Sequence, residues 1–490
     1  MTLAAVFRER CRTDYEKRLL ILDQTSFSDV FDYISVLNGS GFRVIEYTDP
    51  LEFRVVFERE IRDSQEKFAV ILRSETYVPY DIRKAFRLVE LNFAALFPNL
   101  DAGILKNYPN DAELILFACD ELYDDLSGDP EATRRFIEHK AFSQVNIKQY
   151  GQQKLKELVH RSEKQLSAAE WIRIAEERAQ LEMYLRKAGL TMDAAPLNEA
   201  FRAFIFQDYP KLSSAPDVEF PWMLPKVLDF IMMKRKPGQK TALLLIDGMA
   251  MVDYDVMRQY WQGIHRKEHA TFAMIPTTTA ISRQSLFSGK YPQQLPDPFS
   301  LKNEEKQFFA ALAAYGYDKK EVLFTRGYQP EITSKTAFAA VILNDIDEFV
   351  HGQMQSGIGM YNDVNLYGRT QKLQNLIRYL VQNDFRVYLT SDHGNTPAIG
   401  RGKLKNTGVE TESRSSRMVV REEFAGDLSD DDRLIRYPGY YLNKNYQYYI
   451  CENGVALETN DADVVAHGGI SMDEVIVPFI EITGVDGYGK

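Results

Sequence analysis

Residues Thr241 to Gly248 read TALLLIDG, a short apolar run that is closed by an aspartate and a glycine. Continuous apolar runs of this length are typical of strands that helices cover on both faces. Further runs follow and alternate with helix-period stretches: TFAMIP from Thr271, EVLFT from Glu321, AFAAVILND from Ala337, FRVYLTSD from Phe385 and EVIVPFIEI from Glu474. The chain from Thr241 onward is therefore predicted to form an α/β sheet.

Polar residues follow several of these runs. Ligands of open α/β sheets bind just beyond the carboxyl ends of the strands, so side chains placed there are candidates for a functional site. The candidates, in chain order, are Asp247, Thr279 in PTTTAISRQSLFSG, Asp347 and His351 in NDIDEFVHG, Asp392 and His393 in LTSDHGN, and His467 in AHGG.

These residue types suit divalent metals. Carboxylates and neutral imidazoles bind zinc or manganese where no thiolate is offered, so we expect zinc, with manganese as the alternative. Asp347 and His351 are four residues apart and can face the same way across one helical turn. Metals activate weak hydroxyl nucleophiles, and a pair of metals can hold both oxygens of an in-line phosphoryl displacement. We expect two sites, one from Asp347, His351 and His467, and one from Asp247, Asp392 and His393 with the Thr279 hydroxyl.

The order Asp, Thr, Asp-x-x-x-His, Asp-His, His resembles the alkaline phosphatase superfamily, especially its nucleotide pyrophosphatase/phosphodiesterase branch. The stretch Thr279 to Gly289 resembles the nucleophile segment of that branch, with Thr279 as the nucleophile. Thr277 and Thr278 compete for this role, and the spacing to Ser285 and Gly289 favours Thr279. The closest resemblance is to PglZ-domain proteins, over residues 240–484, in PTTTAISRQSLFSG, the Asp-x-x-x-His pair, SDHGN and AHGG.

This resemblance implies an alkaline-phosphatase-like catalytic domain over residues 236–490. It implies a metal-dependent phosphodiesterase that acts on nucleotides or oligonucleotides, and a place in a BREX-type phage-defence system with methyltransferase or ATPase partners. A phosphomonoesterase or phosphomutase of the same superfamily is one alternative, and a scaffold subunit with a structural metal site is another. A sulfatase is disfavoured because no Cys- or Ser-x-Pro-x-Arg surrounds Thr279, and a Rossmann dehydrogenase because no G-x-G-x-x-G follows a strand.

Residues 1–145 are predicted to form a smaller α/β domain. The expected strands are LLILD, RVIEY, FAVIL and ELILFA, with a helix in DIRKAFRLVELNFAALF. The layout resembles a response-regulator receiver, yet the third strand ends in Leu72-Arg73-Ser74, without an aspartate to accept a phosphoryl group. A structural or partner-binding domain is therefore expected.

Residues 146–235 are predicted to be a helical linker region. Ser167 and Glu170 form a capping-box pattern that marks a helix start. The basic stretch KRKPGQK, Lys234 to Lys240, with Pro-Gly at its centre, is the expected linker to the catalytic domain.

The stretch from Arg401 to Arg421 holds six basic and two acidic residues, a net charge of +4 in a chain of net charge −11. It begins beside the expected site, so it is a candidate to grip a polyanionic substrate; a solvated insertion is the alternative. The candidate substrate-binding residues are Arg283, Lys403, Arg414 and Arg417. Tyr437, Tyr440 and Tyr441 are predicted to pack rather than to stack on a base, and His265 and His269 to lie at a solvated helix end.

The composition of the 490 residues argues against several classes of protein: those whose whole surface binds nucleic acid, and disulfide-rich, secreted and membrane-spanning proteins. A net charge of −11 gives no sign of a surface built for nucleic acid as a whole. The three cysteines are far apart and predict neither disulfides nor a zinc–cysteine cluster. The start lacks the apolar stretch of a secretory signal, and no run approaches the roughly 18 apolar residues of a membrane span. We expect a soluble, cytoplasmic protein without a membrane partner.

Overall fold

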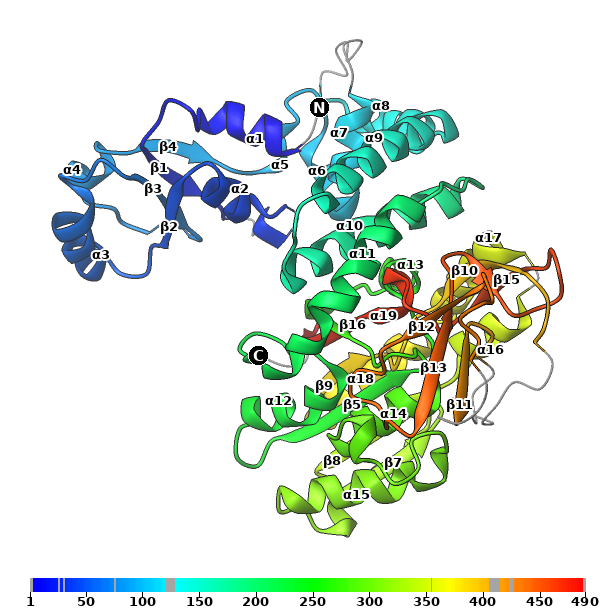
Figure 1. Ribbon diagram of the computed structural model, residues 1–490. Helices are drawn as coiled ribbons and strands as arrows, with labels where there is room; N and C mark the ends of the chain where they lie inside the picture. Colours follow the sequence, from blue (N-terminus) through cyan, green and yellow to red (C-terminus); the bar gives the residue numbers. More distant parts are fainter. Residues whose placement is uncertain are drawn as a thin grey trace. The chain divides into compact units, whose positions relative to one another are not determined.

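In the computed structural model, most of the apolar runs of the sequence become strands, which form four sheets together with strands from other segments (Figure 1). The structure describes residues 3–24, 27–29, 31–74, 76–119, 128–353, 355–404, 415–422 and 427–487. The chain divides into two units, Met1–Tyr150 and Gly151–Lys490. Among the described residues, no helix combines the length and the apolar character that crossing a membrane requires.

The first unit contains a four-stranded parallel sheet with the order β2-β3-β1-β4. Its strands are β1 (Arg18–Leu22), β2 (Phe42–Glu46), β3 (Lys67–Leu72) and β4 (Arg87–Glu90). Its helices are α1 (Leu3–Cys11), α2 (Tyr33–Gly39), α3 (Pro50–Val56), α4 (Tyr80–Arg83), α5 (Phe93–Leu96), α6 (Ala102–Leu105), α7 (Ala112–Ala118) and α8 (Pro130–Phe136). A flavodoxin-like sheet, the fold of receivers, has β1 between β2 and β3. Here β1 lies between β3 and β4, so the receiver-like layout is wrong.

Two of the expected elements of this unit are different in the structure. ELILFA belongs to helix α7, because a short buried apolar run looks the same in a strand and in a buried helix. The expected helix in DIRKAFRLVELNFAALF is divided into α4, β4 and α5. Only one residue of β4, Val89, is buried. The sequence of this strand therefore does not show the alternation of apolar and polar residues that would indicate a strand.

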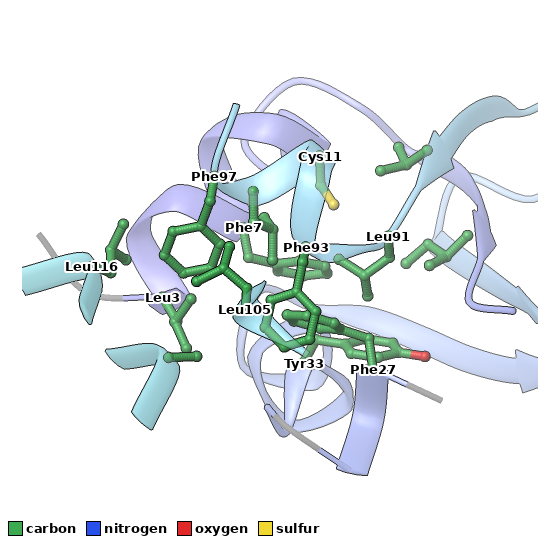
Figure 2. Packing of buried hydrophobic residues seen from close by; sticks show 14 of the residues in the cluster. Leu3, Phe7, Cys11, Phe27, Tyr33, Leu91, Phe93, Phe97, Leu105 and Leu116 are labelled. Carbon is green, nitrogen blue, oxygen red and sulfur yellow. The ribbon is translucent and has the colours of Figure 1, made fainter. Parts of the chain in front are cut away.

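The core of the first unit is built from α1, α2, the β-sheet and the helices that follow β4 (Figure 2). Aromatic side chains meet there: Phe7 lies against Tyr33, and Phe27 against Phe93. Asp23, at the end of β1, is buried and accepts hydrogen bonds from the Arg73 guanidinium at 2.7 Å and from the Tyr33 hydroxyl at 2.8 Å. An ion pair between Asp23 and Arg73 therefore joins the residues that follow β1 and β3.

The second unit begins with helices. The long helices are α9 (Gln144–Ser162, which starts in the first unit), α10 (Ala168–Lys187), α11 (Ala195–Gln207) and α12 (Val227–Lys234). The capping box is confirmed, because Ser167 caps α10 and Glu170 returns the hydrogen bond. Residues of α12 share a hydrophobic cluster with Leu243 and Leu245. The basic stretch at Lys234 is therefore a short connection inside the second unit.

The main sheet of the second unit has six strands in the order β6-β16-β9-β5-β8-β7. These are β5 (Lys240–Ile246), β6 (Ile264–Phe272), β7 (Val322–Arg326), β8 (Phe338–Leu343), β9 (Phe385–Thr390) and β16 (Ile476–Val485). Its helices are α13 (Met251–Arg258), α14 (Thr279–Ser288), α15 (Glu304–Ala314), α16 (Asp345–Gly352), α17 (Ser356–Arg369), α18 (Lys372–Gln382) and α19 (Met472–Val475). Side chains of α12, α14 and α15 pack on the face that carries Leu243 and Leu245.

Two small sheets complete the unit. One has the order β14-β10-β15 and the other the order β11-β13-β12. Their strands are β10 (Thr396–Gly400), β11 (Met418–Glu422), β12 (Leu434–Tyr437), β13 (Tyr446–Cys451), β14 (Val455–Ala456) and β15 (Asp463–Ala466).

Strand direction decides which residues meet. Strands β9, β5, β8 and β7 are parallel, while β16 is antiparallel to both β9 and β6. The carboxyl ends of β5, β6, β8 and β9 therefore lie at the same end of the sheet, together with the amino end of β16. Ile246 pairs with Leu343, and Leu245 with Thr390, so the residues that follow these three strands emerge at nearly the same level.

The helix end expected around His265 and His269 is wrong. Both residues lie in strand β6, which pairs with β16 along its whole length. His265 forms an exposed ion pair with Asp486 at 2.8 Å, and the His269 ring stacks on Phe220. The charged residues between them, Arg266 to Glu268, pair with β16 in an antiparallel ladder. A run of charged residues such as this one does not indicate a strand in the sequence.

Candidate metal centre

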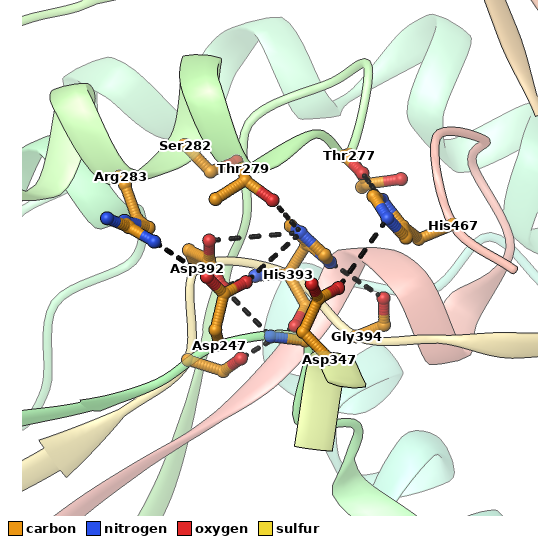
Figure 3. Close-up of polar contacts among 12 residues, drawn as sticks. Asp247, Thr277, Thr279, Ser282, Arg283, Asp347, Asp392, His393, Gly394 and His467 are labelled. Carbon is orange, nitrogen blue, oxygen red and sulfur yellow. Dashed lines mark hydrogen bonds and ion pairs between the residues drawn. The ribbon is translucent and has the colours of Figure 1, made fainter. Parts of the chain in front are cut away.

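Asp247 follows strand β5 directly and is 3% exposed. Its Oδ2 accepts a hydrogen bond from the buried Arg283 guanidinium at 2.7 Å. Its Oδ1 has no hydrogen-bond partner. The arginine therefore fixes the carboxylate and leaves one oxygen facing the end of the sheet (Figure 3).

Asp392 and His393 follow strand β9 and are completely buried. Asp392 Oδ1 accepts hydrogen bonds from the backbone N–H groups of Gly248 and His393, while its Oδ2 is unpartnered. His393 Nδ1 donates to the Gly394 carbonyl at 3.0 Å. This bond fixes the tautomer, so the lone pair of Nε2 points to the two carboxylates, 3.8 Å from Asp247 Oδ1 and 3.8 Å from Asp392 Oδ2.

Asp347 and His351 lie one turn apart on α16, with His351 Nε2 3.3 Å from Asp347 Oδ1. Glycine is needed at position 248, where φ is +72° and a Cβ would already touch Asp347 at 3.4 Å. The turn after β5 can therefore approach α16 closely.

His467 reaches the same place from the loop before β16. Its Nδ1 donates to the Thr277 carbonyl at 2.9 Å, and its Nε2 lies 3.8 Å from Asp347 Oδ1. The Thr277 hydroxyl donates to the Gly469 carbonyl and accepts from the Gly468 N–H, so it is fully used in holding this loop. His467 therefore presents an unprotonated Nε2 to the site, whereas at His393 burial is outweighed by Asp392 and Asp247, which raise its pKa.

Thr279 is the first residue of α14, and its side-chain hydroxyl lies 3.1 Å from His393 Nε2 (Figure 3). The neighbouring Thr278 is completely buried and its hydroxyl has no partner. Of the three consecutive threonines, Thr279 is the one whose hydroxyl contacts a candidate metal ligand.

The seven candidate residues therefore converge. Two groups of side chains have ligand atoms within 4.8 Å of one another: Asp347 with His351 and His467, and Asp247 with Asp392 and His393. Two donors that bind one zinc ion tetrahedrally at about 2.1 Å lie about 3.4 Å apart. The separations of 3.3 and 3.8 Å are close to this value. These two groups match the sets that the sequence predicts.

The pKa values reflect crowded carboxylates in a buried place. Burial raises the pKa of Asp392 to about 7, and the neighbouring Asp247 adds to the effect. Burial lowers the pKa of His467 to about 3, which keeps the imidazole neutral. Burial opposes ionisation of Asp347, but the neighbouring His351 outweighs it and holds the pKa of Asp347 near 2. A second negative charge beside Asp247 is therefore costly at Asp392, and a bound cation between these carboxylates would offset that cost.

The candidate substrate-binding residues differ in their exposure to solvent. Arg417 is 1% exposed and forms an ion pair with Glu474, so an open substrate contact for this residue is wrong. Arg283 is equally enclosed, between Asp247 and Glu304, and supports the candidate ligand Asp247. Lys403 is exposed, with Glu458 at 3.1 Å, and Arg414 lies outside the described residues.

Tyr437, Tyr440 and Tyr441 are packing residues, as expected. Tyr437 is buried and lies edge-on to Tyr440. The hydroxyls of Tyr440 and Tyr441 donate to backbone carbonyls of Phe206 and Pro210.

Two buried glutamates support the site without a signal in the sequence. Glu304 receives three hydrogen bonds from arginines, two of them from Arg283. Glu474 binds Arg417 and the backbone near His467. Glu474 begins the run EVIVPFIEI, which is predicted to be a strand, and no pattern singles out Glu304, so only their burial distinguishes them.

A family model described as BREX system PglZ alkaline phosphatase-like domain matches residues 230–482, more than half of the chain. No curated protein matches the sequence. Similar solved structures include murine ectonucleotide pyrophosphatase/phosphodiesterase 5, with a TM-score of 0.37 and 12% identity over 49% of this chain and 88% of that one. The human form has a TM-score of 0.36 and 14% identity over 51% and 90%. Phosphonoacetate hydrolase from Sinorhizobium meliloti has a TM-score of 0.34 and 11% identity over 50% and 90%.

Proposed function

The chain belongs to the PglZ family of alkaline phosphatase-like domains, and on this premise we propose that it is a metal-dependent phosphodiesterase with Thr279 as its nucleophile. The family membership makes it a phosphoesterase-type hydrolase of the alkaline phosphatase superfamily. The proposed substrates are phosphodiesters of nucleotides or oligonucleotides. The proposed setting is a BREX-type phage-defence complex.

One observation carries the proposal. Four buried acceptor atoms that face the same place have no hydrogen-bond partner: Asp247 Oδ1, Asp347 Oδ1, Asp392 Oδ2 and His467 Nε2. Buried polar atoms are almost always partnered, so this cluster of acceptors without hydrogen-bond partners supports a cation site at this place. Aspartate and neutral histidine, without thiolate, favour zinc, with manganese as the alternative.

The donor groups would hold one ion between Asp347, His351 and His467 and a second between Asp247, Asp392 and His393. Bound divalent ions supply Lewis acidity, which lowers the pKa of a nearby hydroxyl and neutralises the charge that develops on phosphate oxygens.

The residues of the chain supply the nucleophile and its position. Thr279 loses its hydroxyl proton to solvent, and its Oγ1 attacks phosphorus in line as the bond to the leaving oxygen breaks. The leaving group departs as the alkoxide and takes a proton from water. Thr279 lies at the start of α14, where backbone N–H groups without helical partners favour a phosphate oxygen. Water then attacks the phosphothreonine from the opposite side, which releases the product phosphate ester and restores the hydroxyl.

The net charge of +4 in the stretch from Arg401 to Arg421 supports an extended polyanionic substrate. Lys403 is exposed on the segment that follows β10, and Arg414 follows in the same stretch of sequence. We assign both residues to phosphate contacts outside the reacting centre. The defence complex is assigned from the family description, with a methyltransferase or an ATPase as the proposed partner.

The test measures metal content and hydrolysis together. Purified protein is stripped with chelator, reconstituted with zinc or manganese, and assayed on bis-(4-nitrophenyl) phosphate and on 4-nitrophenyl phosphate. About two metals per chain, with hydrolysis of the diester preferred, would support the proposal. A preference for the monoester would replace the phosphodiesterase by a phosphomonoesterase. Two metals without hydrolysis of either ester would favour a scaffold with a structural metal site.

A further inference from the structure

Glu474 is completely buried on the short helix α19, between the turns that carry His393 and His467. On the basis of the proposed metal site, we infer that Glu474 is a positioning residue that holds both histidine ligands, and that Arg417 in turn holds Glu474. Neither residue is among the candidate metal ligands, so this role is separate from ligation.

The side chain of Glu474 fixes the turn of His467. Its Oε1 accepts a hydrogen bond at 2.7 Å from the N–H of Gly469, two residues after the histidine. On the other side of the same turn, Gly468 N–H donates to the Thr277 hydroxyl at 3.0 Å. The backbone after His467 is therefore held at two consecutive N–H groups.

The backbone of Glu474 fixes the turn of His393. Its carbonyl accepts a hydrogen bond at 3.0 Å from the N–H of Gly394, the residue whose own carbonyl accepts from His393 Nδ1. A Cβ on Gly394 would lie 1.9 Å from the carbonyl oxygen of Asp473. The contact is thus a close backbone-to-backbone approach, and movement of α19 would move the ring of His393.

Arg417 makes the buried carboxylate possible. Its Nε donates to Glu474 Oε1 at 3.0 Å, and another of its nitrogens donates to the Val455 carbonyl. Glu474 Oε2 accepts from the backbone N–H and hydroxyl of Ser471 at 3.0 and 2.6 Å. Both oxygens of the carboxylate are fully used, which is the condition for a stable buried charge. One residue therefore sets the relative position of ligands from both proposed metal groups.

Groups that orient metal ligands from outside the coordination sphere typically contribute ten- to a hundredfold to metal affinity. Glu474→Gln keeps the size of the side chain but replaces an acceptor by a donor that faces Arg417 and Ser471. Gly469→Ala keeps both charged residues and adds a methyl group 2.8 Å from Glu474 Oε2 and 2.9 Å from an Arg417 nitrogen. The control is Asp255→Asn, which alters a buried ion pair with Arg258 that touches neither turn.

The experiment titrates chelator-treated, full-length protein with Co²⁺ and follows the visible absorption of the bound ion, below the unfolding temperature of each variant. We expect both substitutions in the Glu474 network to weaken cobalt binding ten- to a hundredfold and to change the spectrum, while Asp255→Asn changes neither. Excess Co²⁺ should restore much of the hydrolysis of bis-(4-nitrophenyl) phosphate.

Wild-type affinity and spectrum in both folded variants would overturn the positioning role and leave the proposed function intact. If Glu474→Gln does not fold, the result for Gly469→Ala decides. Absence of cobalt binding by the wild-type protein would instead overturn the proposed function itself.

Discussion

The imidazole rings of His393 and His467 are stacked, with ring centroids 4.1 Å apart and ring planes inclined by 15°. The two histidines come from neighbouring antiparallel strands, one following β9 and the other preceding β16. Each donates from Nδ1 to a backbone carbonyl, so both Nε2 atoms face carboxylates. The stack therefore places the two donor groups side by side, as in sites where a pair of metals acts on one phosphate.

Replacement of Thr279 tests the nucleophile. Thr279→Ala should lower kcat for bis-(4-nitrophenyl) phosphate by about a thousandfold or more, because among the described residues no other hydroxyl contacts the imidazole of His393. Metal content and circular dichroism should stay at wild-type values. The matched control is Thr278→Val, which keeps the shape of a buried neighbour and should keep activity. Loss of activity in the control alone would transfer the nucleophile role to Thr278.

Replacement of one aspartate tests the pairing of ligands into two sites. Asp347→Asn weakens the group that contains His351 and His467 and leaves the Asp247 group unaltered. Metal analysis should therefore fall from about two zinc ions per chain to about one. Asp345→Asn, two residues earlier on α16, is the control, since Asp345 binds Tyr328 and belongs to neither donor group. Two tightly bound zinc ions in Asp347→Asn would contradict this assignment.

The pH dependence of metal binding follows from Asp392. Its pKa of about 7 means that the metal-free site holds a proton at pH 6 that it has mostly lost at pH 8. Zinc must displace this proton, so zinc affinity should rise from pH 6 to pH 8. Calorimetry in two buffers of different ionisation enthalpy should detect more protons released per zinc at pH 6. An equal release at both pH values would show that Asp392 is already ionised at pH 6.

The same group affects the stability of the metal-free protein. The pKa of Asp392 is higher in the folded protein than in the unfolded chain, so its protonated form stabilises the fold. This contribution to the free energy of unfolding is complete below the pKa of the unfolded chain and is lost as the pH rises through about 7. The rise in melting temperature on adding zinc should therefore be larger at pH 8 than at pH 6. Differential scanning fluorimetry of the wild type and of Asp392→Asn measures this, and the difference should shrink in the variant.

Arg283 tests the support of the site. Arg283→Met leaves the buried carboxylates of Asp247 and Glu304 without their shared partner. The free energy of unfolding of the metal-free protein should fall by about 3–5 kcal/mol, the usual cost of breaking a buried pair. Urea unfolding measures the change, and zinc should recover part of it. Lys403→Ala, from an exposed pair, should cost less than about 1 kcal/mol.

The basic segment tests the substrate class. Lys403→Glu combined with Arg414→Glu should raise KM for a single-stranded oligonucleotide about tenfold and leave kinetics on bis-(4-nitrophenyl) phosphate unchanged. Fewer phosphate contacts should also weaken the dependence of KM on salt. An unchanged KM for the oligonucleotide would remove this segment from the substrate path.

Much of the second unit follows from local features of the sequence. Runs such as TALLLID are strands because both of their faces are covered, and the pattern of ligand types at their ends is visible without a structure. Predictions failed where the local signal was ambiguous. ELILFA became a helix, RLVE a strand with a single buried side chain, and the segment of His265 and His269 a strand with charged residues.

The sequence by itself determined which atoms are available: three aspartates, three histidines and a threonine, in an order typical of one superfamily. Only the tertiary structure decided how they meet. The antiparallel direction of β16 brings His467 and the supporting Glu474, which precede the strand, to the end of the sheet where the other candidate ligands follow their strands. The tertiary structure also pairs Arg417 with Glu474 and Arg283 with Asp247 inside the protein. Periodicity reports the environment of a segment, whereas strand direction and buried charge pairs depend on contacts between residues far apart in the chain.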